Sequence, residues 1–329
     1  MASGDLVIGV DGGGTKTVAV LADASGREVA RALGAGTNLQ TVGAAVVRDR
    51  LSGLFEAILG GVTGAATVRA VAVALAGVDR PADIPVATTA ILDGITAARM
   101  RSPGVSWSLP SGLPTVVNDA VAALAAGAET LDGVVVIAGT GSIAFGTCRG
   151  VRARAGGWGS ILGDEGSGYA LGYHALRAVA RAHDGRAPET GLTGAILARL
   201  GVPSAPDLIA TVSAPGWGVA ETAGLAPVVV KAAENGDPVA VALVDEAAAE
   251  LALAAVAVID ALPFDPDHHL PVVQAGGLWG ASARLREQFA ARLGQRTANA
   301  RPAVLTAEPV LGAVWIARRD AGLLDGARP

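Results

Sequence analysis

The sequence predicts an α/β fold of two domains, and three observations support this prediction. Strand patterns alternate with helix patterns along most of the chain, which is typical of sheets covered by helices. A length of 329 residues exceeds one ordinary core and suggests about two domains. A strand, a glycine turn and a second strand occur together twice, in residues 6–21 and in residues 134–147.

The expected elements of the first half follow apolar periodicity and turn residues. In chain order they are strands at residues 6–10, 18–21 and 28–33, a helix at 42–59, a strand at 68–75, a linker rich in Pro and Gly at 101–114, a strand at 115–117, and a helix at 120–126 closed by Gly127.

The second half is expected to be more helical. In chain order its elements are strands at residues 134–138 and 143–147, helices at 169–183, 192–200 and 239–262, a strand at 272–274 followed by the glycine turn Gly276–Gly277, and a helix at 311–319.

Composition excludes several classes of protein. The formal charge of −5 argues against a surface for nucleic acid or for an anionic membrane. Cys148 is the single cysteine, which excludes a disulfide framework and an all-cysteine metal or iron–sulfur site within one chain. No targeting segment is visible, and the longest apolar region, residues 239–262, carries four acidic residues that disfavour a bilayer. A reducing cytoplasm is the expected location.

The first glycine turn, in residues 9–17 (GVDGGGTKT), is typical of a polyphosphate site. Its tip is nearly bare backbone, so N–H groups can approach phosphates closely. Asp11 beside this turn is placed to hold a hydrated Mg²⁺. A Walker A loop is excluded, because the chain continues into a strand rather than a helix. A glycine hairpin without a ligand is the alternative.

Three further segments carry candidate chemistry. In residues 116–127 (VVNDAVAALAAG), Asp119 stands at a strand-to-helix junction, where it is either a catalytic base or simply an N-cap. Residues 134–146 (VVVIAGTGSIAFG) form a second turn able to wrap phosphates; a dinucleotide fingerprint is disfavoured there because strand continues after the turn. Residues 156–172 (GGWGSILGDEGSGYALG) bring Asp164 toward a polar ligand, or form a mobile surface loop.

Taken in this order, the motifs resemble the sugar kinase and actin superfamily of ATPases, and most closely the BadF/BadG/BcrA/BcrD-type ATPase family in its N-acetylglucosamine kinase-like branch. Residues 272–280 (VVQAGGLWG) match the adenosine motif, and residues 308–317 (EPVLGAVWIA) match the closing segment. The segment GGWG followed by GDEGSGY is the narrowest signal, and it favours an N-acetylated substrate. The lone Cys148 disfavours the iron–sulfur branch of the family.

The resemblance implies two actin-like (ribonuclease H-like) domains with a nucleotide and sugar cleft between them. Residues 1–117 would form the N-terminal domain, to which a helix at 311–329 returns, and residues 118–310 the ATP-binding domain, with a hinge near 101–118. The implied enzyme is an ATP-dependent kinase acting on the 6-hydroxyl of an amino sugar, most simply N-acetylglucosamine. Glucosamine kinase, N-acetylmuramic acid kinase and a non-catalytic nucleotide- or sugar-binding regulator stay open.

The resemblance also implies residue roles and partners. Asp119 would be the catalytic base, and Asp11 would order Mg²⁺ through water. Contacts to ATP are expected at Gly12, Gly13, Gly14, Thr15, Lys16, Thr140, Gly141, Ser142, Gly276 and Gly277. Contacts to the sugar are expected at Asn38, Asp119, Thr140, Gly157, Trp158 and Asp164. Lys16, Asp79 and Arg80 are equally compatible with ordinary surface positions. A homodimer is implied by the family, with no nucleic acid or membrane partner.

Overall fold

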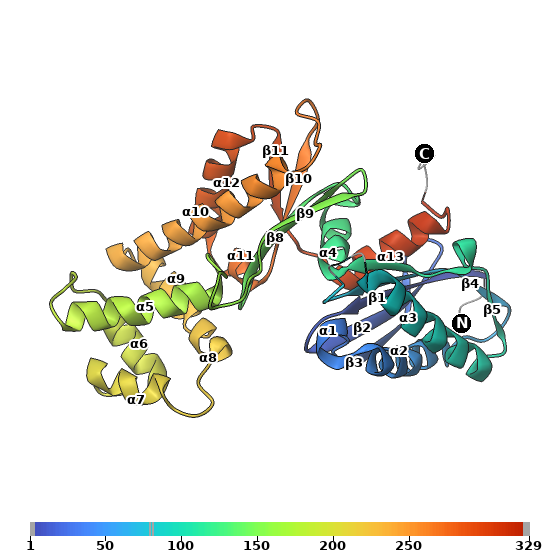
Figure 1. Ribbon diagram of the computed structural model, residues 1–329, viewed down its shortest axis with the longest axis horizontal. Helices are drawn as coiled ribbons and strands as arrows, with labels where there is room; N and C mark the ends of the chain where they lie inside the picture. Colours follow the sequence, from blue (N-terminus) through green and yellow to red (C-terminus); the bar gives the residue numbers. More distant parts are fainter. Residues whose placement is uncertain (1–3, 79, 81, 325–329) are drawn as a thin grey trace. The chain divides into compact units, whose positions relative to one another are not determined.

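The chain folds into two compact units. The computed structural model describes residues 4–78, 80 and 82–324. Unit 1 comprises Met1–Leu131 and Leu305–Pro329, and unit 2 comprises Asp132–Val304. Each unit contains one mixed β-sheet with helices packed against it (Figure 1). The predicted α/β class is therefore confirmed.

The sheet of unit 1 has six strands in the order β3-β2-β1-β4-β5, with β6 also paired to β4. The strands are β1 (Gly4–Gly12), β2 (Lys16–Asp23), β3 (Glu28–Ala35), β4 (Ala66–Leu75), β5 (Val105–Trp107) and β6 (Thr115–Asn118). The first three form an antiparallel meander, whereas β4 runs parallel to β1, β5 and β6. Gly12, Leu75 and Asn118 consequently lie in one row at the carboxyl edge of the parallel strands.

Helices cover both faces of this sheet. They are α1 (Leu39–Val42), α2 (Ala44–Leu59), α3 (Asp83–Arg101), the 3₁₀ turn η1 (Pro110–Gly112), α4 (Asp119–Ala128) and α13 (Pro309–Asp320). Leu6, Ile8 and Val10 of β1 belong to the core beneath α2 and α3. The alternate residues of β1 face α13. A Cβ at Gly9 would lie 2.5 Å from the backbone nitrogen of Val314, so this glycine permits close approach of α13.

The sheet of unit 2 repeats the layout of unit 1. Its order is β11-β10-β7-β8-β9, with strands β7 (Gly133–Ala138), β8 (Ser142–Cys148), β9 (Val151–Gly156), β10 (Leu270–Ala275) and β11 (Ala300–Val304). Again three strands form an antiparallel meander, and a later strand, β10, pairs parallel with the first of them. Each of the two predicted glycine turns joins the first and second strands of its meander.

Unit 2 is rich in helices. They are α5 (Gly168–His183), α6 (Leu192–Leu200), η2 (Ala205–Asp207), α7 (Leu208–Val212), α8 (Val219–Ala223), α9 (Ala226–Glu234), α10 (Pro238–Asp260), α11 (Gly277–Ala281) and α12 (Ala283–Arg296). Among the described residues, no single helix is long and apolar enough to cross a membrane, and only the pair 192–200 and 205–212, bent by 51°, meets that criterion together.

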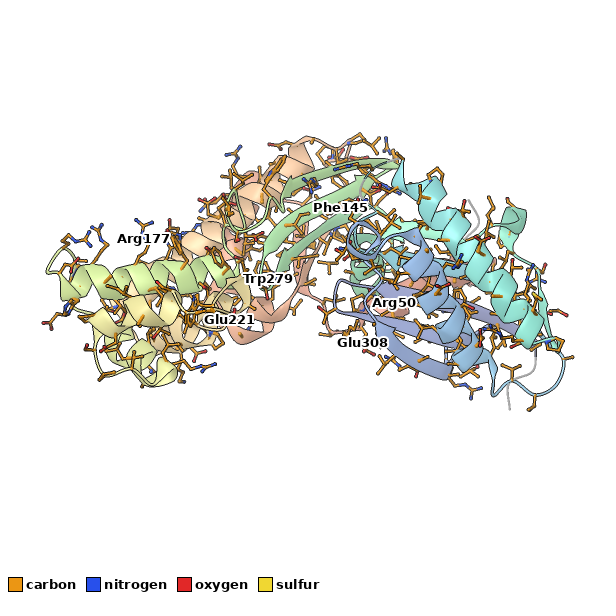
Figure 2. The ribbon with its side chains drawn as sticks, turned by 60° about the horizontal axis from the view of Figure 1, so that its bottom comes forward. Arg50, Phe145, Arg177, Glu221, Trp279 and Glu308 are labelled. Atoms are coloured by element: carbon orange, nitrogen blue, oxygen red, sulfur yellow. The ribbon has the colours of Figure 1, made fainter. Side chains whose placement is uncertain are left out.

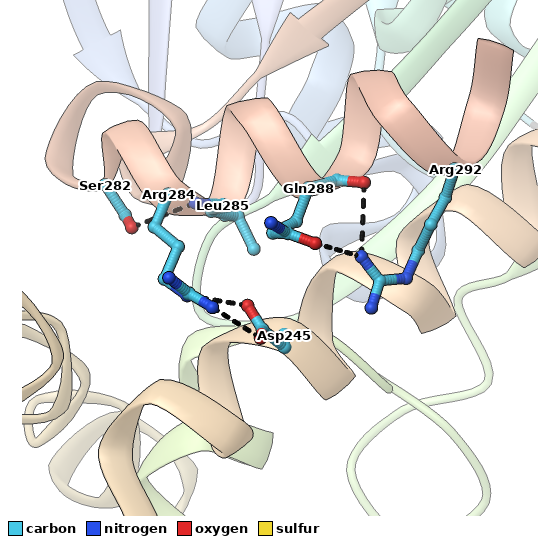
Figure 3. Close-up of polar contacts among 6 residues, drawn as sticks. All are labelled: Asp245, Ser282, Arg284, Leu285, Gln288 and Arg292. Atoms are coloured by element: carbon cyan, nitrogen blue, oxygen red, sulfur yellow. Dashed lines mark hydrogen bonds and ion pairs between the residues drawn. The ribbon is translucent and has the colours of Figure 1, made fainter. Parts of the chain in front are cut away.

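Two sets of contacts fix α11 and α12 in unit 2. Trp279, labelled in Figure 2, is fully buried. Its Nε1 donates to the carbonyl of Val136 at 3.0 Å, and its ring meets Phe289 edge-on. Arg284 of α12 forms a bidentate ion pair with Asp245 of α10, with both distances 2.7 Å (Figure 3). Ser282 accepts from the backbone N–H of Leu285 and caps α12 (Figure 3).

The structure differs from the sequence interpretation in several places, and it contains helices that the sequence analysis did not predict, among them α3, α9 and α12. The helix expected at residues 42–59 is interrupted at Gly43, whose φ of 78° separates α1 from α2. The expected linker at residues 101–114 contains β5 and η1, and β5 pairs with β4. Gly127 lies inside α4, which ends instead at Glu129 in the left-handed conformation. Compact unit 1 extends through α4 to Leu131, beyond the boundary expected at residue 117.

Candidate active site

The first glycine turn connects β1 and β2 in unit 1. The N–H of Gly13 donates to the carbonyl of Lys16 at 3.0 Å, which closes a tight hairpin. Gly12 is buried, whereas Gly14, Thr15 and Lys16 are exposed. A Cβ at Gly12 would lie 2.2 Å from Oγ1 of Thr37, so glycine is required for this packing. The tip presents nearly bare backbone, as a phosphate-binding turn needs.

Asp11 is the titratable group at the end of β1. Burial, reinforced by the nearby carboxylate of Asp119, raises the pKa of Asp11 to about 6. Lys16 opposes this shift, and Glu308 adds to it. All four residues belong to unit 1. Two neighbouring carboxylates repel each other, and a bound cation would relieve that repulsion.

Asp119 stands at the beginning of α4, but it is not the N-cap. That position belongs to Asn118, whose Oδ1 accepts from the N–H of Ala120 at 2.8 Å. Asp119 is half-buried in the first helical turn. Because β6 ends in the same row as β1, Asp119 follows directly from the edge that carries Gly12. Asn118 therefore occupies the N-cap position, and the Oδ1 of Asp119 accepts from the same N–H of Ala120 at 3.0 Å.

Asn38 lies in the loop that follows β3 in unit 1. Its Oδ1 accepts from the N–H groups of Gln40 and Thr41, at 3.0 and 3.2 Å, and so caps α1. The Nδ2 amide is then the part of this side chain suited to a sugar hydroxyl, as a donor. The backbone N–H of Arg80 donates to Asp83 at 2.8 Å. Asp79, also considered from the sequence, lies outside the described residues.

The second glycine turn connects β7 and β8 in unit 2. The N–H of Gly139 donates to the carbonyl of Gly141 at 3.0 Å. The carbonyls of Gly139 and Thr140 accept from Gly168 and Tyr169 at the start of α5, at 2.8 and 3.1 Å. Thr140 is exposed. The Oγ of Ser142 donates to the carbonyl of Glu165 at 2.6 Å, so a phosphate contact from this hydroxyl would require exchange of that bond.

Asp164 is buried against this second turn. Its Oδ1 accepts from the N–H of Ser142 at 3.2 Å, and a Cβ at Gly141 would lie 2.9 Å from the same oxygen. Asp164 adopts a φ of 61°, the left-handed region, which Asp tolerates better than most residues. The structure thus brings the expected sugar residue Asp164 together with the expected phosphate residues Gly141 and Ser142.

Gly157 and Trp158 follow β9 in the same unit. Gly157, at a φ of 68°, donates its N–H to the carbonyl of Ser142 at 3.0 Å. Trp158 is 63% exposed, and the guanidinium of Arg154 lies 5.1 Å from the centre of its ring. Ile161 in the same loop is 93% exposed. Trp158 is therefore available for contact rather than part of the core.

Gly276 and Gly277 form the turn between β10 and α11. A Cβ at Gly276 would lie 2.4 Å from the carbonyl oxygen of Ala138, and its φ is 102°. This turn consequently lies against the strand end that precedes the second phosphate turn. Both glycines are exposed, while Leu278 and Trp279 just after them are buried.

Sequence reasoning missed three residues beside the first turn. Thr37 is fully buried against it, Arg50 of α2 donates to the carbonyl of Gly36, and Glu308 acts on Asp11. The motif GAGTN, residues 34–38, held a usable signal, since a threonine between glycines and Asn38 is placed to bond the neighbouring strand. Arg50 gave no signal, because its partner is a backbone carbonyl fourteen residues away.

The described residues contain no group of three or more His, Cys, Asp or Glu side chains arranged to hold a metal ion. A hydrated Mg²⁺ needs fewer protein ligands, because it usually keeps several waters and binds through one or two carboxylates together with substrate phosphates. Asp11, at the end of β1 beside the first glycine turn, fits that requirement.

Two actin-like sheets, each with a glycine turn after its first strand, define the class: the fold of nucleotide-dependent sugar kinases. The model of the BadF/BadG/BcrA/BcrD ATPase family matches residues 8–317. This chain belongs to that family.

Two relatives found by sequence are named as kinases of N-acetylated amino sugars. The chain is 32% identical over 328 residues to an N-acetyl-D-glucosamine kinase of Dictyostelium discoideum, covering 96% of this chain and 98% of the relative. It is 34% identical over 316 residues to an N-acetylmuramic acid/N-acetylglucosamine kinase of Clostridium acetobutylicum, covering 95% and 98%. The expected class, an ATP-dependent sugar kinase family, is confirmed at the level of the family.

Solved structures share the fold. A Chromobacterium violaceum protein described as a candidate N-acetylglucosamine kinase matches with a TM-score of 0.62 at 29% identity, covering 94% of this chain and 97% of that one. A glucokinase of the ROK family from Streptomyces griseus matches with a TM-score of 0.51 at 20% identity, covering 95% and 99%. The second likeness bears on the fold alone.

Proposed function

We propose that this protein transfers the γ-phosphoryl group of ATP to the 6-hydroxyl of an amino sugar, with N-acetylglucosamine as the first candidate. The observation that carries the proposal is the pair of carboxylates on unit 1. Asp11 and Asp119 are close enough to perturb each other, and they flank a turn of nearly bare backbone. Phosphoryl transfer requires these parts: neutralised phosphates and a base on the nucleophile.

Asp119 is the proposed base. Its carboxylate would accept the proton of the 6-hydroxyl while the sugar oxygen attacks the γ-phosphorus; the bond from that phosphorus to the β–γ bridging oxygen breaks, and ADP leaves. Mg²⁺ bound with ATP would supply charge neutralisation at the phosphates. Asp11 would hold that ion through water. Gly14 and Thr15 would donate backbone N–H groups to the phosphates, and Gly13 would hold the turn closed, because its own N–H bonds the carbonyl of Lys16.

In unit 2, Thr140 and Gly141 would add phosphate contacts, and Gly276 with Gly277 would lie against the adenosine. Ser142 supports this turn by its two internal hydrogen bonds. Lys16 is exposed at the start of β2, where its charge favours a phosphate nearby.

The proposed sugar contacts are of three kinds: a hydrogen-bond donor, a hydrogen-bond acceptor and an apolar surface. Asn38 would donate from Nδ2, because two backbone N–H groups already use its Oδ1. Asp164 would accept a ring hydroxyl at Oδ2, because its Oδ1 accepts from Ser142. Gly157 and Trp158 would contact the acetamido group, whose methyl suits the exposed indole. A site that also pairs the polar atoms of the acetamide discriminates strongly against sugars that lack it.

N-acetylmuramic acid is a second candidate, favoured by the relative from Clostridium acetobutylicum whose name includes both sugars. Glucosamine is a third. A non-catalytic regulator of the same fold is the alternative outside enzymology, and a ROK family transcriptional regulator does share the fold, with a TM-score of 0.56 at 15% identity. A homodimer and a cytoplasmic location stay predictions.

The test is sugar-dependent release of ADP, measured by a coupled assay with N-acetylglucosamine, N-acetylmuramic acid, glucosamine and glucose. N-acetylglucosamine should give the highest kcat/KM, and phosphorus NMR of the product should show a 6-phosphate. Equal turnover of glucose would remove the amino-sugar assignment. Absence of turnover with every sugar, in a protein that binds ATP, would favour the regulator.

A further inference from the structure

The loop before Asn38 is packed directly onto the first phosphate turn. The N–H of Gly36 donates to the carbonyl of Thr15 at 3.1 Å, and the N–H of Thr37 donates to the carbonyl of Gly13 at 2.9 Å. A Cβ at Gly36 would lie 2.1 Å from the carbonyl oxygen of Gly14. The turn and the loop therefore touch through their backbones, with no side chain between them.

A buried pair of hydroxyls joins the same two segments. Oγ1 of Thr37 lies 3.0 Å from Oγ1 of Thr17, and Thr17 also donates to the carbonyl of Ala35 at 2.8 Å. Both threonines are fully buried. Thr37 is followed immediately by Asn38, so a displacement of the turn is transmitted to Asn38 through one peptide unit.

Arg50 of α2 contacts the same loop at Gly36. Its place on α2 is labelled in Figure 2. The Nη1 of Arg50 donates to the carbonyl of Gly36, and the side chain is half-buried. The donor is charged, and such hydrogen bonds are shorter and stronger than neutral ones. Arg50 thus holds in place the residue whose backbone lies against the tip of the phosphate turn.

We propose that Arg50 is a positioning residue that couples nucleotide binding to sugar binding within unit 1. It acts through Gly36: the same backbone segment contacts the phosphate turn on one side and continues into Asn38 on the other. Occupancy of the turn then favours the loop geometry that Asn38 needs, and the reverse holds because such coupling is reciprocal. The inference rests on the proposed function for the identity of the sugar.

The test compares Arg50→Met with the matched control Arg48→Met. Arg48 lies on the same helix, but it is exposed and forms its ion pair with its neighbour Asp49. Titration calorimetry would measure the affinity for Mg²⁺ and the ATP analogue AMP-PNP, with and without N-acetylglucosamine. The wild type and Arg48→Met should show an affinity gain of about 5- to 150-fold with sugar, the usual range of coupling. Arg50→Met should lose most of that gain.

Arg50→Lys is the conservative variant. A lysine offers one charged donor, which suffices for a single carbonyl, so this variant should keep most of the coupling. Equal coupling in the wild type and Arg50→Met would overturn the proposal, and so would a loss in Arg48→Met as large as that in Arg50→Met.

A second measurement tests the coupling independently of the proposed kinase activity. It uses only the wild-type protein, so it does not depend on the folding of a variant. Hydrogen exchange of the peptide spanning residues 36–42 is followed in the wild type with Mg²⁺ and AMP-PNP alone. Slower exchange of this peptide supports the coupling even if no amino sugar is phosphorylated. Unchanged exchange under saturating nucleotide overturns the coupling even if kinase activity is found.

Discussion

Asp164 accepts a hydrogen bond from the backbone N–H of Ser142 at 3.2 Å, so a residue expected to hold the sugar is attached to a turn expected to hold phosphate. Only one carboxylate oxygen is used in this bond. The neutral variant Asp164→Asn keeps an acceptor for Ser142, and asparagine also tolerates the left-handed φ of 61° at this position.

We expect Asp164→Asn to fold normally and to raise the KM for the sugar by about 10- to 100-fold, the effect of losing a charged hydrogen-bond partner. The KM for ATP should change less. Steady-state kinetics with each substrate varied in turn measures this. Glu165→Gln is the control, because the side chain of Glu165 is exposed. An unchanged KM for the sugar in Asp164→Asn would remove Asp164 from the sugar contacts.

Asp119→Asn should lower kcat by about 10²- to 10⁴-fold, the usual contribution of a general base. Because Asn118 caps α4, the melting temperature should stay close to that of the wild type. Asn118→Ala should instead lower the free energy of unfolding by about 1 kcal/mol, because this variant loses the N-cap of α4. Turnover and thermal unfolding of both variants check this pair. Full activity of Asp119→Asn would show that another group takes the proton.

The pKa of Asp11 predicts a pH dependence of stability in the metal-free protein. The folded value of about 6 lies above the ordinary 3.8, so the folded state binds the proton more tightly, and stability falls as pH rises from 3.8 to about 6. Asp11→Asn removes this loss. The variant should therefore gain about 1–2 kcal/mol over the wild type between pH 4 and pH 7, allowing for solvent screening.

Urea unfolding without Mg²⁺ at several pH values measures this difference. Asp119, Glu308 and Lys16 are the charged groups that act on Asp11, so Lys16→Met should enlarge the wild-type loss, since lysine lowers the pKa of Asp11. Added Mg²⁺ at pH 7 should stabilise the wild type more than Asp11→Asn. A difference that does not vary with pH would contradict the raised pKa.

Trp158→Ala should discriminate between sugars rather than unfold the protein, because the indole is 63% exposed. We expect kcat/KM to fall about tenfold or more for N-acetylglucosamine, the size of a lost apolar contact in a specificity pocket. Glucosamine should be affected less. Equal losses for both sugars and for glucose would mean that Trp158 only shapes the loop.

Much of the fold could be predicted because its signals are local. Continuous runs of Val and Ile between glycines, as in residues 134–138, identify buried strands from neighbouring residues alone. The strand β5 was missed because three residues among prolines and glycines carry too little periodicity, and its pairing with β4 comes from distant sequence.

The candidate site was predictable only in part. The glycine turns and Asp119 stand in recognisable motifs, but only the structure shows that Asn118 rather than Asp119 is the N-cap of α4. Arg50 contacts a backbone carbonyl fourteen residues away, and no residue pattern encodes that contact.

The position of α13 has a consequence for the synthesis of the chain. This helix lies against β1 and α4, where Gly312 meets the backbone of Ala122, yet it follows all of unit 2 in the sequence. On the ribosome, the β1 face around Gly9 therefore stays uncovered until residues 309–320 have been added, while unit 2 already has every segment it needs. Domains generally fold as units during translation. The unit that begins the chain is therefore completed after unit 2, and the face of β1 around Gly9 lacks its covering helix until then.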